Sequence, residues 1–119
     1  MARSEVSIAS LTAYNTAGTV TADAVAVSDE HFINIKNYKD EKLLIRLYGG
    51  SAAGFTAVFK AGSYPAGGIG DLTVAVAATA IKIICLESAR FKNSDGYILI
   101  DAASTGTATA ATIECFSHA

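Results

Sequence analysis

The feature that most constrains this chain is the alternation of apolar and polar residues with a period of two. In the segment 42–48 (KLLIRLY), the apolar residues Leu43, Ile45 and Leu47 alternate with other residues, Arg46 among them. A period of two places successive side chains on opposite faces of an extended strand. We therefore expect a strand whose leucine and isoleucine side chains face a core and whose arginine faces outward.

The same alternation recurs along most of the chain, between segments rich in glycine, asparagine and aspartate that favour turns. No window of eleven or more residues has an apolar stripe at helical spacing, and residues 87–91 allow at most one helical turn. Because residues 49–54 are a short glycine-bounded link, we expect the strands on either side of them to form a hairpin. The eight expected strands are 5–9, 31–37, 42–48, 55–60, 72–77, 80–86, 97–101 and 112–116.

Seven or eight short strands in 119 residues predict an all-β domain, either a two-sheet sandwich or a small barrel. Jelly-roll-like and immunoglobulin-like topologies both fit the pattern. The length favours a single domain over residues 1–119, with residues 1–17 as a candidate N-terminal arm.

The surface is expected to be poor in charge. Only 17% of the residues are charged, against about 25% in an average domain, and the formal net charge is −2. A weakly acidic chain does not attract nucleic acid or anionic lipid, and it has no run of 18 apolar residues that would span a membrane. We favour a protein that binds other protein surfaces over an alanine-rich monomer.

The sequence offers little catalytic chemistry, so we expect no enzyme, no catalytic residues, no metal site and no cofactor. His31 and His118 are the only histidines, and we expect residues 29–31 to form a solvated turn at the start of a strand. The glycine-rich segment 62–70 lacks the Lys-Ser/Thr end of a phosphate-binding loop. It is either a loop that contacts a partner or a loop without a role.

The two cysteines, Cys85 and Cys115, lie in expected strands without CxxC spacing or neighbouring histidines. Buried free thiols are the first interpretation, and a disulfide between the two strands is the alternative. Candidate partner-contacting residues are apolar or aromatic residues near the N-terminus and in the glycine-rich loop. They are Val6, Ile8, Leu11, Tyr14, Tyr64, Pro65 and Ile69.

The second half of the chain resembles the small capsid decoration, or head cement, proteins of tailed bacteriophages. The resemblance rests on GDLTVAV at 70–76, IKI at 81–83, LESARFK at 86–92 and DGYILID at 95–101. These segments govern packing and turns, and the first half is compatible but carries no such motif. The two cysteines are not part of the resembling pattern.

The resemblance implies a structural virion protein, made in the host cytoplasm, that binds the major capsid protein on the capsid exterior and stabilises the shell. It also implies a homo-oligomer, with a trimer favoured. Two alternatives stay open: a β-sandwich module that binds a glycan or another host-surface ligand, and a small virion protein of the tail.

Overall fold

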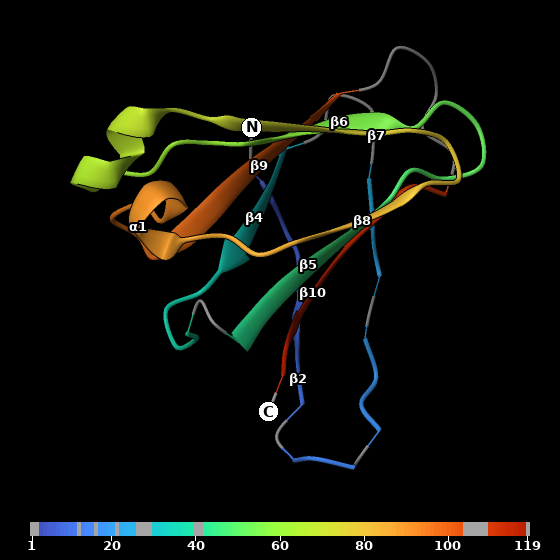
Figure 1. Ribbon diagram of the computed structural model, residues 1–119, viewed down its shortest axis with the longest axis horizontal. Helices are drawn as coiled ribbons and strands as arrows, with labels where there is room; N and C mark the ends of the chain where they lie inside the picture. The colour runs from blue at the N-terminus through green and yellow to red at the C-terminus, as the bar shows by residue number, and fades with distance from the viewer. Residues whose placement is uncertain are drawn as a thin grey trace.

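Two mixed β-sheets stacked face to face form the molecule (Figure 1). The computed structural model describes residues 3–11, 13–15, 17–20, 22–25, 30–39, 42–103 and 110–118. One sheet, called sheet A, has the strand order β1-β4-β9-β6-β7. The other, sheet B, has the order β2-β10-β5-β8, with β3 also paired to β10. The sandwich prediction is confirmed, and the alternative of a small barrel is wrong.

Each of the eight expected strand segments contains or overlaps an observed strand, and the segment 5–9 is divided between two strands. β3 had no predicted counterpart. In the described parts of the chain the strands are β1 (Ser4–Glu5), β2 (Ile8–Ser10), β3 (Asp23–Ala24), β4 (Glu30–Asn34), β5 (Leu43–Tyr48), β6 (Phe55–Phe59), β7 (Leu72–Val76), β8 (Ile81–Ile84), β9 (Tyr97–Ala103) and β10 (Thr112–Ser117).

The core lies between the sheets and is built from alternate residues of the central strands. Leu43, Ile45 and Leu47 of β5 are buried, as the alternation predicts, while the residues between them are half-buried. β6 repeats the pattern with Phe55 and Phe59. Burial of each large apolar side chain stabilises the folded state by roughly 1.5–3 kcal/mol.

The predicted hairpin across residues 49–54 is wrong. β5 pairs with β10 and β8 in sheet B, whereas β6 pairs with β7 and β9 in sheet A. The link therefore crosses from one sheet to the other. Two glycines permit this path, because a Cβ atom at Gly49 would lie 1.9 Å from the Ala77 carbonyl oxygen, and Gly54 has a φ of +69°.

The N-terminal segment closes one side of the sandwich. β1 lies parallel to β4 in sheet A, and β2 lies parallel to β10 in sheet B. Val6, between these two short strands, is fully buried and donates its backbone N–H to the Phe32 carbonyl at 2.8 Å. Residues 4–10 of the predicted arm thus contribute an edge strand to each sheet.

One further expectation needs correction. His31 was expected in a solvated turn, but it lies in β4 and is buried. Side chains alternate along β4, so His31 lies on the same face as the buried Ile33, and Phe32 lies on the other face. On β8, the side chains of Ile81 and Ile83 are exposed.

Helical structure is limited to short turns in the described residues. α1 (Ser88–Phe91) is a single turn, which confirms the expectation for residues 87–91, and η2 (Pro65–Ile69) is a 3₁₀ helix. No helix among the residues described here has the length and apolar character needed to cross a membrane.

Replacement of Gly54 by alanine is expected to destabilise the protein by about 2 kcal/mol or more. The added Cβ would lie 2.3 Å from the Val76 carbonyl oxygen, at a positive φ that alanine rarely adopts. Urea unfolding measures the effect. Gly68→Ala is the matched control, because a Cβ at Gly68 has no heavy atom within 4 Å and should leave the unfolding midpoint nearly unchanged.

Candidate interaction surfaces

Large exposed apolar side chains lie in three places among the described residues. Tyr14 is 80% exposed in the segment after β2. Tyr64 and Ile69 are 48% and 70% exposed in the loop between β6 and β7. Ile81 and Ile83 are 52% and 61% exposed on β8. Exposed apolar side chains that cluster on a surface are typical of interaction sites.

The loop between β6 and β7, residues 61–71, is called the tip loop, and a carboxylate at its end holds its two ends together. Asp71 Oδ1 accepts a hydrogen bond from the Ala61 N–H at 2.6 Å, and Oδ2 accepts one from Lys60 Nζ at 2.8 Å. The Lys60 hydrogen bond, followed by that of Ala61, lowers the pKa of Asp71. The same contact with Asp71 raises the pKa of Lys60.

Arg90 of α1 fastens the tip loop from the other side. Its Nε donates to the Gly70 carbonyl and its Nη2 donates to the Asp71 carbonyl, both at 3.1 Å. In return, the Arg90 carbonyl accepts the N–H of Gly62 at 2.8 Å. α1 and η2 consequently lie side by side at one end of the molecule (Figure 1).

The residue after Arg90 connects this end to the core. The Phe91 ring is buried and meets the Phe59 ring edge-on, with 6.4 Å between ring centroids. The Arg90 guanidinium lies 4.8 Å from the centroid of the Phe91 ring. The tip loop is therefore attached to the sandwich through side chains of α1.

Glycine in the tip loop allows close backbone packing. A Cβ at Gly62 would lie 2.3 Å from the Lys92 carbonyl oxygen, and one at Gly67 would lie 2.4 Å from the Gly62 carbonyl oxygen. The backbone of the loop can approach α1 and fold on itself only without these side chains. The loop thus presents Tyr64, Pro65 and Ile69 to solvent from a packed base.

The N-terminal candidates separate into buried and exposed residues. Val6 is fully buried and has no surface to offer a partner. Ile8 is half-buried and packs against the core, and Leu11 is half-buried. Tyr14 is exposed. The sequence pattern had identified apolar character at these positions, but not which of them the neighbouring strands would cover.

The open edge of β8 is an exposed surface that the sequence did not predict. β8 lies at the edge of sheet B, with β5 on one side and no strand on the other among the described residues. On the outer face of the sheet, Ile83 lies opposite Arg46, and Arg46 lies opposite Glu114. Arg46 and Glu114 form an ion pair, so this part of the face carries no net charge next to the isoleucine.

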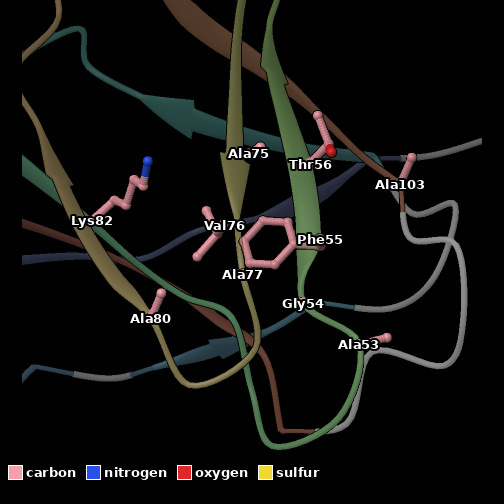
Figure 2. A pocket seen from close by; sticks show the side chains of 10 residues that line it. All are labelled: Ala53, Gly54, Phe55, Thr56, Ala75, Val76, Ala77, Ala80, Lys82 and Ala103. Atoms are coloured by element: carbon pink, nitrogen blue, oxygen red, sulfur yellow. The ribbon is translucent and has the colours of Figure 1, made fainter.

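A groove of about 480 Å³ runs along the ends of β6 and β7 and the turn that leads to β8 (Figure 2). Its volume falls in the range of small-molecule sites. Its walls are mainly apolar, and Lys82 is the one charged side chain among the lining residues. These are Ala53, Gly54, Phe55, Thr56, Ala75, Val76, Ala77, Ala80, Lys82 and Ala103.

Both cysteines are free thiols, so the disulfide alternative is not realised in the structure. Cys115 on β10 is buried, as the first interpretation expected, whereas Cys85 is exposed just after β8, and the expectation of burial is wrong for it. Burial raises the pKa of the Cys115 thiol to about 12. Cys115 is therefore protonated and unreactive at neutral pH.

Over the described ranges, no group of three or more His, Cys, Asp or Glu side chains is placed to hold a metal ion. Comparisons of this chain with known protein families, with curated proteins and with solved structures found no match.

Replacement of Asp71 by asparagine should lower the stability of the protein at neutral pH, because the charged contact with Lys60 is lost. A carboxylate whose pKa is lowered on folding stabilises the protein above the ordinary carboxyl pKa of about 4, and loses this contribution as the pH falls through its lowered value. The difference between Asp71→Asn and the parent chain should therefore shrink in acid. Urea unfolding across pH measures it, with Asp95→Asn as the control in an exposed turn.

Thiol labelling should distinguish the two cysteines. In the native protein, a thiol reagent should modify Cys85 rapidly and Cys115 only after unfolding. Cys85→Ser should abolish native labelling, and Cys115→Ser should leave it unchanged. Equal labelling of both thiols, or none before reduction, would contradict the assignment.

Proposed function

We propose that this chain is a structural virion protein, a decoration or cement subunit that binds the outer capsid lattice of a tailed phage and stabilises the shell. The observation that carries the proposal is the tip loop, where Tyr64, Pro65 and Ile69 are exposed on a hydrogen-bonded base. An apolar knob of this kind suits a pocket or joint on another protein surface.

The fastening of the loop matters for binding. A loop that is already ordered loses less conformational entropy when it meets a partner, so more of the contact energy contributes to affinity. Aromatic anchors such as Tyr64 are frequent among residues that dominate binding. The tip loop combines both properties.

The segments that carry the family resemblance also build the base of the tip loop. GDLTVAV begins with Gly70 and Asp71, and LESARFK contains Arg90, whose guanidinium binds the carbonyls of both. Two segments that resemble decoration proteins thus meet where the candidate contact residues are held. This coincidence supports a function in which the shape of the loop is used.

A decoration subunit acts in many copies, and each copy needs only a modest contact. The proposed partner is the major capsid protein, and the proposed location is the capsid exterior. The chain carries few charges, which favours apolar contact with protein over attraction to phosphate or lipid. In this proposal the chain has no catalytic role.

A second candidate is a ligand-binding module for a glycan or another host-surface molecule, and the groove beside β7 favours it. The groove has the volume for a small ligand. Its lining is dominated by alanine, and the one aromatic residue in it, Phe55, is buried. Sugar rings stack on exposed aromatic faces, so the groove is poorly equipped for a glycan.

The test adds purified protein to undecorated shells of the cognate major capsid protein. Binding is measured by co-sedimentation, and the shell melting temperature by calorimetry. The expected result is saturable binding with a higher melting temperature. Joint replacement Tyr64→Ser and Ile69→Ser should weaken binding by about tenfold or more. Thr73→Ala is the control, since it truncates an exposed side chain on β7 that is not among the candidate contact residues.

Binding that persists in the tip-loop variant would reject the tip loop as the contact surface. Absence of shell binding, together with saturable binding to immobilised glycans, would favour the second candidate. Binding to isolated tails instead of shells would move the protein to the tail of the virion.

A further inference from the structure

In the part of the chain that the structure describes, the outer edge of β8 has backbone groups that no neighbouring strand pairs. Gly49 donates its N–H to the Ala80 carbonyl at 2.9 Å, and these two residues continue the antiparallel register of β5 with β8. In such a ladder, hydrogen-bonded pairs alternate with non-hydrogen-bonded pairs. The N–H and C=O groups of Ile81 and Ile83 therefore point away from β5, to the open side.

The side chains of Ile81 and Ile83, with that of Cys85 just after the strand, form an exposed apolar row. Ile81 and Ile83 are more than half exposed, and Cys85 is exposed as a free thiol. An edge with unpaired backbone groups and apolar side chains is a template for another strand. Soluble proteins usually protect such edges with charge, and β8 carries a single charged residue, Lys82.

The charge of Lys82 determines which register of pairing with another β8 strand is favourable. If β8 pairs antiparallel with β8 of a second copy about a two-fold axis at Lys82, two ammonium groups face each other, which is unfavourable. If the axis passes through Ile83, Lys82 lies opposite the partner's Ile84, and Ile81 lies opposite the partner's Cys85. In that register every outward-facing pair is apolar, and the like charges are no longer opposed.

We propose that a second copy of this chain pairs with β8, antiparallel and centred on Ile83, so that the two copies of sheet B form one continuous sheet. The contact is isologous, because the same residues serve both copies. The Arg46–Glu114 ion pair beside Ile83 leaves this part of the outer face without net charge, so the two copies do not repel each other there. This contact goes beyond the proposed function, since the tip loop can bind a partner without it.

The first experiment measures oligomeric state by sedimentation velocity over a range of protein concentrations. The expected result is a monomer–dimer equilibrium. Ile83→Lys places two lysines opposite each other and should weaken dimerisation by at least about tenfold. Ile69→Lys is the matched control, because it changes an exposed isoleucine in the tip loop and should leave the equilibrium unchanged. Circular dichroism checks that both variants fold.

The second experiment tests the register. In a Cys85→Ser background, Ile83→Cys should form an intermolecular disulfide under mild oxidation, because directly opposite residues of a hydrogen-bonded pair lie about 5.5 Å apart between Cα atoms. Lys82→Cys in the same background should form much less of it.

A monomer at every concentration would overturn the proposal and would mean that Lys82 protects the edge. A trimer, the oligomer that the family resemblance favours, would overturn it as well. So would a dimer that is insensitive to Ile83→Lys and lacks the position-83 crosslink. None of these results depends on shell binding, so failure of this contact is distinguishable from failure of the proposed function.

Discussion

Burial of alternate side chains between two sheets is the interaction on which the rest of the structure depends. Leu47, Phe59 and Ile100 come from different strands and are all fully buried in the same core. The strands carry half of their residues inward and leave the other half for the surface. The tip loop and the edge of β8 keep their shape because they are attached to strands that this core holds in place.

The alternation predicted the central strands and their inward faces, and Ile45 is an example. It could not predict which sheet each strand joins, because that choice depends on pairing between residues far apart in the sequence. β5 and β6 are adjacent in the chain and fit a hairpin by length, yet they lie in different sheets. The prediction for His31 was wrong for a related reason. Charged neighbours in the sequence suggested a solvent-exposed turn, whereas the alternation of side chains along β4 places the ring in the core.

Part of the candidate site could be predicted from residue type. Tyr64 and Ile69 are apolar residues in a glycine-rich loop, and the structure leaves them exposed. The role of Arg90 in fastening that loop could not be predicted, because it joins residues about twenty positions apart. The edge of β8 was missed since IKII has the composition of a buried strand, and only the strand order shows that one of its sides is open.

The parallel pairing at the N-terminus has a consequence for how the protein is made. β2 leaves the ribosome well before its partner, β10, because the two paired strands lie far apart in the sequence. The sandwich therefore cannot close until β10 has been synthesised, and contacts of such long sequence separation form slowly. Until then Val6 is exposed to solvent, so the nascent chain has exposed apolar surface that the folded protein buries.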